Sequence, residues 1–521
     1  MDKPTMHMLS VEDKGGQTRR TNQYIAAVAA AIGAVVAGTI LAWTAPALPQ
    51  LKPPEANKTV LLVNNTELVN NTGVVVNNTA AVVNLTALVN STAANGTLIN
   101  SLGEAADFLL TTSDESVVSS ILAIGAALSA LPVGMLAQRA GRRPTILILA
   151  IPFMINWLLT IFANGVGMLI AARFFAGLGT GGICVAAPMY IGEIAETSIR
   201  GALGAFFQLF LTVGILFTYV VGAWTHWRLL SIVSAVFPIL LVAAFWWMPE
   251  TPQYLLSKNR RRDAERSLRW LRGPDADLTA ELEDMQKDVD EAARQRTGFV
   301  AGLLGMVRNR APRAALVCGL GLMFFQQFSG INAVIFYTTD IFKSAGSDIK
   351  PPIATIIVGV VQTIATCISS MLIEKAGRRI LLLQSCIIMG INLIILGVYF
   401  RLKDSHYIVD AVGWLPLVCL VLFIISFSMG FGPIPWMMMA ELFPVEYRAT
   451  ATGFTVIANW LLVFIVTLCF PIVKDAIGIY SCFWFFAAVM VVCVFFVFFL
   501  IPETKGKTVS QIQTILGGKK A

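Results

Sequence analysis

The chain has little charge and almost no histidine. Asp, Glu, Lys and Arg together make up 13% of its 521 residues, whereas a soluble protein carries about 25%. Mean hydropathy is +0.72. The three histidines, His7, His226 and His406, are too dispersed for a metal site. The composition excludes a soluble globular protein, gives no metal centre and indicates an integral membrane protein.

We expect neither a disulfide framework nor a cleavable leader. The eight cysteines lie inside or at the ends of apolar stretches, which is typical of buried thiols rather than of a disulfide framework. The N-terminal segment has charges of both signs and no cleavage site, so we expect no removed signal peptide.

Twelve apolar spans are long enough to cross a bilayer, which takes about 20 residues. They cover residues 24–46, 117–137, 145–163, 167–189, 202–222, 229–248, 314–339, 352–373, 380–400, 413–436, 450–471 and 481–501. An even number puts both termini on one side, and the Arg-rich loops then all fall on that side, which predicts cytoplasmic termini. The net charge of +7 therefore reflects these loops and not a nucleic-acid site.

These predicted spans contain no Asp, Glu or His, and Arg173 is their one charged residue. A proton relay at membrane depth needs a titratable acid or histidine. The spans therefore offer no group for proton coupling.

Residues 50–115, between the first two spans, repeat a unit rich in Val, Asn and Thr. The segment carries N-x-[ST] sequons, the acceptors of N-glycosylation, at Asn57, Asn64, Asn70, Asn77, Asn84, Asn90 and Asn95. The topology independently puts this loop outside the cell. It is either a glycan-bearing stalk or a low-complexity expansion without a mechanistic role, and we expect glycans on at least some sites.

The two halves of the chain repeat each other. RAGRR at 139–143 follows the second span and KAGRR at 375–379 follows the eighth. E-x6-R recurs after spans four and ten, and PET recurs after spans six and twelve. The duplication predicts an all-α membrane protein with twelve transmembrane helices in two pseudo-symmetric six-helix bundles, the architecture of a rocking transporter.

We divide the chain accordingly. The expected parts are a cytoplasmic N-terminus (1–23), an N-terminal bundle (24–250) that includes loop 50–115, a cytoplasmic linker (251–313), a C-terminal bundle (314–501) and a cytoplasmic tail (502–521). The linker is rich in helix formers but poor in apolar side chains, so we expect short amphipathic helices under the membrane domain rather than an independent domain.

Residues 321–337, GLMFFQQFSGINAVIFY, place Gln326, Gln327 and Asn332 in the middle of the seventh span. Polar groups at this depth are costly unless they face protein or a watery cavity. Amides donate and accept hydrogen bonds without the desolvation cost of a charge. The stretch therefore predicts the wall of a site for a neutral, hydroxyl-rich solute, with interhelical packing as the alternative.

Seven motifs occur in a fixed order: RAGRR, PMYIGEIAETSIRG, PETPQYL, QQFSGINAVIFY, KAGRR, GPIPWMMMAELFP and PETKGKT. Together they resemble the sugar porter family of the major facilitator superfamily over nearly the whole membrane portion, and are most similar to insect facilitated trehalose transporters. Two departures are Gln253, where the family usually has Arg, and the longer first loop.

The resemblance implies a sugar site built from amides and indoles. Its expected ligands are Gln208, Gln326, Gln327, Asn332, Gln362, Trp436, Asn459 and Trp460. Interfacial anchoring is the alternative for the two tryptophans. Ser428 stands where glucose carriers have Glu, which leaves room for a different or larger sugar.

The resemblance also implies a cytoplasmic gate of salt bridges that holds an outward-open state, although the same charges could serve only as orientation signals. Its expected members are Arg139, Arg142, Arg143, Glu193, Arg200, Glu374, Arg378, Arg379, Glu441 and Arg448. Pro433 and Pro435 remove backbone donors and are expected to break span ten. In proton-coupled sugar porters the residue that matches Arg173 pairs with an Asp of span one, but Ala45 stands at that place here.

These observations predict a plasma-membrane facilitative transporter for trehalose or a hexose, which works as a monomer in the bilayer by alternating access, without ATP or a cofactor. A proton-coupled symporter and a non-transporting sugar sensor are the alternatives. An enzyme is not expected, because no nucleophile stands with a base. Gly177–Gly182 resembles a dinucleotide motif but lies mid-span without a preceding strand, which favours close helix packing.

Overall fold

In the computed structural model, the described residues are 20–52, 98–99, 105–106, 108–196, 198–274, 276–294, 299–346, 349–405, 407, 412–444, 446–507 and 509–517. Twelve helical segments in this part of the chain are long and apolar enough to cross a membrane. Each overlaps one of the spans predicted from the sequence. The seven glycosylation sequons between Asn57 and Asn95 lie outside the described residues.

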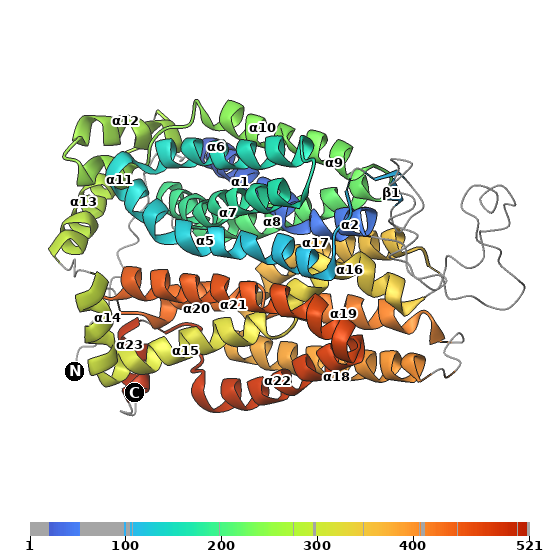
Figure 1. Cartoon of the computed structure of the whole chain (residues 1–521). Coiled ribbons are helices and arrows are strands. Elements are labelled where there is room, and N and C mark those ends of the chain that lie inside the picture. The colour runs from blue at the N-terminus through green and yellow to red at the C-terminus, as the bar shows by residue number, and fades with distance from the viewer. Residues whose placement is uncertain are drawn as a thin grey trace, which may run out of the picture.

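The first six spans form one bundle, in the upper part of Figure 1. Its helices are α1 (Thr21–Ala42) with α2 (Thr44–Leu51), α5 (Thr112–Ala140), α6 (Arg142–Ile161), α7 (Val166–Ile194), α8 (Arg200–Gly222), and α9 (Trp227–Ser234) with α10 (Val236–Phe245). Helix α7 packs against both α5 and α6. A Cβ on Gly177 would lie 2.0 Å from the carbonyl oxygen of Leu122 in α5, so the glycine-rich stretch allows close helix packing.

The last six spans form the second bundle, in the lower part of Figure 1. Its helices are α15 (Arg310–Gln327) with α16 (Ile331–Ala345), α17 (Pro351–Ala376), α18 (Arg378–Asp404), α19 (Leu415–Met429) with α20 (Ile434–Leu442), α21 (Arg448–Ile477) and α22 (Ile479–Leu500). Spans seven and ten are each divided into two helices. The bundles meet where α5 contacts α21, α8 contacts α17 and α2 contacts α16.

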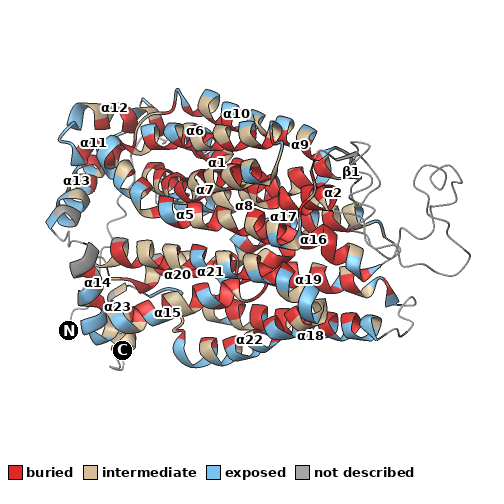
Figure 2. Cartoon of the chain, viewed as in Figure 1, coloured by how far each residue is buried: buried red, intermediate tan, exposed pale blue. Residues whose placement is uncertain are grey.

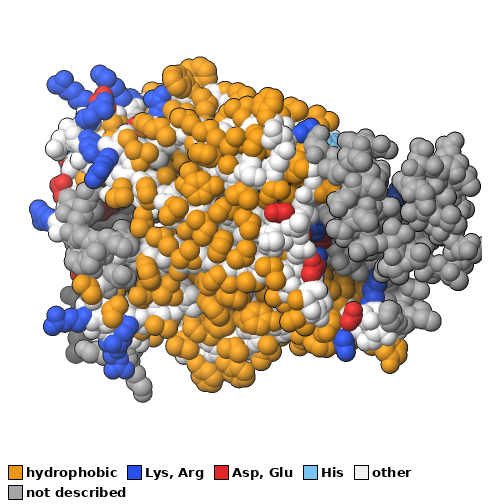
Figure 3. Space-filling model, viewed as in Figure 1, with side chains coloured by type: hydrophobic (Ala, Val, Ile, Leu, Met, Phe, Trp, Pro, Cys, Tyr) orange, Lys and Arg blue, Asp and Glu red, His pale blue; other side chains and the backbone are white. Residues whose placement is uncertain are grey.

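Short helices cover one end of the molecule. They are α11 (Pro252–Ser257), α12 (Arg261–Arg272), α13 (Thr279–Arg294), α14 (Phe299–Arg308) and α23 (Val509–Leu516). Lys and Arg side chains gather at this end in Figure 3, and we call it the basic end. The opposite end, called the loop end, carries the two-residue antiparallel strands β1 (Leu98–Ile99) and β2 (Ala105–Ala106).

Between the two ends the surface is apolar (Figure 3). Ile151, Met371 and Phe499 leave 59%, 72% and 74% of their surface exposed, whereas the faces turned between helices are buried (Figure 2). A continuous apolar belt on this scale would be an aggregation liability in water, but it suits the hydrocarbon core of a bilayer. All eight cysteines are free, including the neighbouring thiols of Cys386 and Cys493.

Candidate functional site

Span seven is interrupted at the polar stretch. Helix α15 ends at Gln327 and α16 begins at Ile331. Gly330 between them has a φ of +87°, in the left-handed region that favours glycine, and a Cβ there would lie 2.6 Å from the ring of Phe486. The Ser329 hydroxyl donates to the carbonyl oxygen of Gln326 at 2.7 Å. The local sequence thus ends one helix and starts the next in the interior of the protein.

Gln326 connects this interruption to the one in span ten. Between α19 and α20 the carbonyl oxygen of Phe431 would need the N–H of residue 435 in a regular helix, but Pro435 has none. The Gln326 amide supplies the missing donor: its Nε2 lies 2.7 Å from the Phe431 oxygen and 3.2 Å from the Gly432 oxygen. Pro433 precedes α20 and Pro435 lies in its first turn, where proline is tolerated.

Four of the eight expected ligands form one hydrogen-bonded chain. Gln326 Oε1 accepts from Asn459 Nδ2 at 3.1 Å and from Gln327 Nε2 at 3.4 Å. Gln327 Oε1 in turn accepts from Asn332 Nδ2. Gln326 thereby accepts two hydrogen bonds and donates to two carbonyls, which leaves its amide little capacity for a ligand, whereas Gln327 and Asn332 keep unused capacity.

The other four expected ligands lie outside this chain. Gln362 Oε1 and Trp460 Nε1 are buried without a hydrogen-bond partner among the described residues. Leaving such a group unpaired costs about 1–3 kcal/mol, so each is suited to a hydroxyl supplied from outside the chain. Gln208 and Trp436 are half-buried, on α8 and α20.

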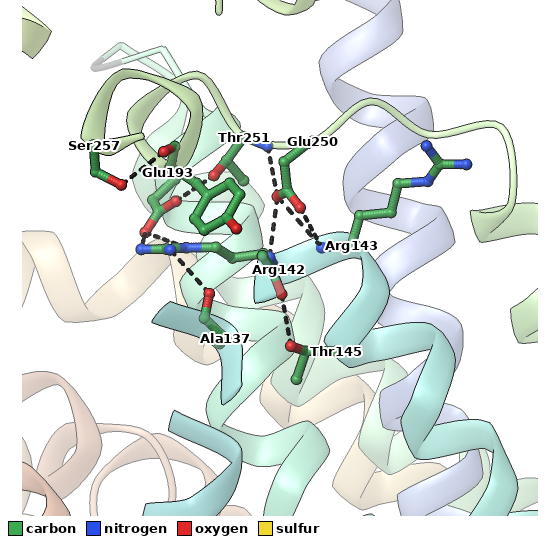
Figure 4. A network of polar contacts seen from close by, with 10 residues as sticks. Ala137, Arg142, Arg143, Thr145, Glu193, Glu250, Thr251 and Ser257 are labelled. Carbon is green, nitrogen blue, oxygen red and sulfur yellow. Dashed lines mark hydrogen bonds and ion pairs between the residues drawn. The ribbon is translucent and has the colours of Figure 1, made fainter. Parts of the chain in front are cut away.

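The basic end of the N-terminal bundle holds a compact charged network (Figure 4). Arg142 donates to Glu193 Oε1 through Nε at 3.0 Å and Nη2 at 2.7 Å. The other oxygen of Glu193 accepts from the Thr251 hydroxyl at 2.6 Å. The start of α6, the end of α7 and the segment before α11 are thus held together.

Glu250 completes this network, and we did not predict its role from the sequence. Its carboxylate accepts from the backbone N–H groups of Arg142 (3.1 Å), Arg143 (3.2 Å) and Thr251 (2.8 Å) (Figure 4). Gly141 has a φ of +109°, and a Cβ there would lie 2.2 Å from Glu250 Oε2. Burial raises the pKa of Glu250, and its backbone hydrogen bonds reduce this rise without cancelling it.

The C-terminal bundle repeats the network. Arg378 donates to Glu441 Oε1 at 3.1 Å, and Glu441 Oε2 accepts from the Thr504 hydroxyl at 2.5 Å. Glu503 accepts from the backbone N–H groups of Arg378 and Arg379 at 3.0 and 3.1 Å. Burial acts to raise the pKa of Glu503, but its backbone hydrogen bonds outweigh burial and lower it. The recurring PET motif was the sequence signal for both glutamates.

The remaining expected gate residues contact their own bundle. Arg200 donates to the carbonyl of Ala195, and Arg448 donates to that of Phe443, both at 3.4 Å. The Arg139 carbonyl accepts from Tyr254. The side chain of Glu374 lies outside the described residues. Among the described residues, the ion pairs Arg142–Glu193 and Arg378–Glu441 each stay within one bundle.

The loop end contradicts the expectation that no acidic side chain lies within a membrane-crossing segment. The second predicted span begins at residue 117 and the seventh ends at residue 339, so they leave out Glu115 and Asp340. Both residues lie inside the membrane-crossing helices α5 and α16, and both are buried, with 3% and 8% exposure. The helices continue past the point where the apolar run stops, because Lys52 pairs with both carboxylates.

Arg173 has no carboxylate partner in the described part of the chain. Its Nη1 donates to the carbonyl oxygen of Ile40 at 2.7 Å, and its guanidinium lies 5.7 Å from the ring centroid of Trp43. A backbone carbonyl and a π face therefore take the place of an acid.

Two matched bundles, two divided spans at their centre and charged networks at one end define a membrane transporter with the major facilitator fold. Solved structures share this fold. The partially occluded inward-open xylose transporter XylE from E. coli superposes with a TM-score of 0.70 at 23% identity, covering 93% of this chain and 99% of that one. The proton:xylose symporter XylE bound to 6-bromo-6-deoxy-D-glucose gives 0.69 at 24%, covering 95% and 99%.

The family is shown by the sequence comparison. The model of the family described as "Sugar (and other) transporter" matches residues 71–516, and the chain belongs to this family. It is 40% identical over 412 residues to the facilitated trehalose transporter Tret1 of Drosophila mojavensis, which covers 79% of this chain and 47% of that protein. The Drosophila erecta protein of the same name is 41% identical over 412 residues, covering 79% and 48%. The chain thus spans about half the length of these curated relatives.

Proposed function

We propose that the protein carries trehalose or a hexose across the plasma membrane by facilitated diffusion, through alternating access of its two bundles. The observation that carries the proposal is the amide chain from Asn332 to Asn459, set where two divided spans meet. Gln327 and Asn332 bind sugar hydroxyls with their remaining capacity. Gln362 and Trp460 add the buried groups that lack partners.

In this proposal the remaining expected ligands play lesser parts. Gln326 holds the divided span ten in shape, and Asn459 positions it. Trp436 and Gln208 border the sugar from opposite bundles. Ser428 is buried, with 4% exposure, and carries no acid for a hexose hydroxyl, which favours a larger sugar such as trehalose.

The positive-inside rule assigns the sides of the membrane. The Arg-rich basic end is cytoplasmic, so both termini face the cytoplasm and the loop end is extracellular. The sequons between residues 57 and 95 then lie in the lumen of the secretory pathway, where glycosylation takes place. The protein works as a monomer, without ATP or a cofactor.

The charged networks at the cytoplasmic end act as the gate. Each network ties its own bundle together, and in the outward-open state Glu193 and Glu441 would also meet arginines of the opposite bundle. In the arrangement described here the bundles touch through α2 with α16 at the extracellular end, and also through α5 with α21 and α8 with α17, while the cytoplasmic ion pairs Arg142–Glu193 and Arg378–Glu441 each stay within one bundle. We assign this arrangement to an inward-facing state because the described residues form no ion pair between the bundles at the cytoplasmic end.

Radiolabelled uptake tests the proposal. A cell without its own sugar carriers should gain saturable uptake of labelled trehalose or a hexose, and a panel of competing sugars should rank the substrates. Gln327→Ala and Asn332→Ala should abolish uptake while surface expression stays intact. Normal uptake in both variants would overturn the site assignment.

Proton-coupled symport is the second candidate, favoured by the buried Glu115 and Asp340. It predicts that sugar addition makes a weakly buffered medium more alkaline, because protons would enter with the sugar. Facilitated diffusion predicts no such change and no acceleration by an inward proton gradient.

A further inference from the structure

Three charged residues lie together at the extracellular end, where the two bundles meet. Lys52 follows α2, Glu115 lies in the first turn of α5, and Asp340 lies near the end of α16. Lys52 Nζ is 2.9 Å from Glu115 Oε1 and also contacts Asp340 Oδ2. The Glu115 and Asp340 side chains are only 4% and 9% exposed.

The Lys52–Asp340 pair joins the bundles, because Lys52 belongs to the N-terminal bundle and Asp340 to the C-terminal one. Breaking a buried pair while its charges stay buried is strongly unfavourable, because it leaves an uncompensated charge away from water. The pair therefore opposes any local opening that does not also admit water. Burial alone would lower the pKa of Lys52, but Asp340 and Glu115 outweigh burial and hold that pKa above its ordinary value.

Uncharged contacts close the same end. The Thr44 hydroxyl of α2 donates to the carbonyl oxygen of Phe336 at 3.1 Å, and the Tyr219 hydroxyl of α8 donates to that of Ile335 at 2.9 Å. Both carbonyls lie in α16, just before its kink at Tyr337, where φ is −124°. Asp340 lies beyond this kink, on the part of α16 farthest from the amide chain.

The charges are unequal, and this decides what happens on opening. Lys52 pairs with both carboxylates, and Glu115 is on the same bundle as Lys52, while Lys474 of α21, which pairs with Asp475, also attracts Glu115 from the opposite bundle. When the bundles separate, Asp340 leaves into water and is hydrated, while Glu115 still holds Lys52 in place. The N-terminal bundle therefore keeps a preformed hydrogen-bond donor for Asp340, and the contact can close again without searching for its geometry.

We propose that Lys52, Glu115 and Asp340 form an extracellular ionic latch that stabilises the inward-facing state and opposes the cytoplasmic charged networks. The proposal rests on the alternating access of the proposed function. Lys52 and Asp340 are the two sides of the latch, and Glu115 is a positioning residue. The relative strength of the extracellular latch and of the cytoplasmic charged networks then sets how often the sugar site faces outward.

Thiol labelling measures this balance. Ser119 lies one helical turn after Glu115 on the same face of α5 and is 1% exposed. In a background where the exposed Cys367 and Cys469 are replaced by Ser, Ser119→Cys provides a reporter that an impermeant maleimide reaches from outside only when this end opens.

Asp340→Asn should raise the outside labelling rate of this reporter about tenfold, because the inward-facing state loses its ion pair. Lys52→Met should act in the same direction. The double swap Lys52→Asp with Asp340→Lys, made together with Glu115→Gln so that the new carboxylate at position 52 faces no second carboxylate, restores an opposite-charge pair across the bundles and should label more slowly than either single variant. Asp404→Asn is the matched control, because Arg401–Asp404 is an exposed pair within α18 at the same end, and should change nothing.

Parent-like labelling in both Asp340→Asn and Lys52→Met, with normal surface expression, would overturn the latch. So would a double swap that labels as fast as the single variants. Labelling needs no transported sugar, so a carrier with no sugar uptake but the expected labelling pattern would refute the proposed substrate and leave the latch standing.

Discussion

The side-chain amide of Gln326 donates to the backbone carbonyl of Phe431 at 2.7 Å, across the contact between spans seven and ten. Pro435 leaves that carbonyl without its helical donor, so the interruption of one span is stabilised by a side chain of the other. The two glutamines of the QQ pair therefore have different tasks, although they are neighbours in sequence.

The first prediction separates the tasks of the two glutamines. Gln326→Leu should lower the thermal stability of the purified protein, because each buried group that loses its partner costs about 1–3 kcal/mol. Gln327→Ala should reduce uptake with a much smaller loss of stability. The check is a thermal melt in detergent beside uptake per surface molecule; equal melting temperatures for both variants would contradict the division.

The second prediction concerns the buried groups without partners. Trp460→Phe keeps an aromatic ring but removes the Nε1–H donor, which has no partner among the described residues. We expect uptake to require about two- to tenfold more sugar for half-saturation, since one hydrogen bond contributes about 0.5–1.5 kcal/mol. Stability should be unchanged or slightly higher. A half-saturation concentration equal to that of the parent would remove Trp460 from the site.

The third prediction concerns the proposed cytoplasmic gate. Glu193→Gln and Glu441→Gln should each bias the carrier towards the inward-facing state, because the outward-open state loses a charged contact. Binding of an outward-facing inhibitor should weaken in both variants. Arg269 pairs with Glu265 on the exposed face of α12, so Glu265→Gln is the control and should bind the inhibitor as the parent does. Unchanged inhibitor binding in Glu193→Gln and Glu441→Gln would argue for orientation signals instead.

The fourth prediction follows from the opposite pKa shifts of Glu250 and Glu503. A raised pKa means that the folded state holds the proton more tightly than the unfolded state does. The contribution of Glu250 to the free energy of unfolding is therefore present at low pH and is lost as pH rises through the pKa of the folded state. A lowered pKa gives Glu503 a contribution that is present above the ordinary value of 4.5 and is lost as pH falls.

Melting temperatures measured from about pH 4 to pH 7, on either side of the ordinary carboxyl pKa, test this difference. The difference in melting temperature between the parent and Glu250→Gln should become smaller as pH rises. The difference between the parent and Glu503→Gln should become larger. Two differences with the same pH slope would show that the two networks titrate alike.

The twelve helices could be predicted because long apolar runs are unambiguous, and the interruption of span ten could be predicted from Pro433 and Pro435, which remove backbone donors. The partner of Gln326 could not, because it depends on which helix lies beside α15. Glu115 and Asp340 were missed for a different reason. A hydropathy window ends at a charge, whereas a helix continues when the charge finds a partner from another span, and Lys52 provides that partner only in the folded chain.

The self-contained networks of the two bundles have a consequence for how the chain can be assembled. Among the described residues, the hydrogen bonds of Glu193, Thr251 and Glu250 go to groups before residue 268, and those of Glu441, Thr504 and Glu503 go to groups after residue 372. Each bundle therefore has its own charged network at the basic end. A gene cut between α13 and α14 should yield two separately translated fragments that insert independently and pair in the membrane to restore transport.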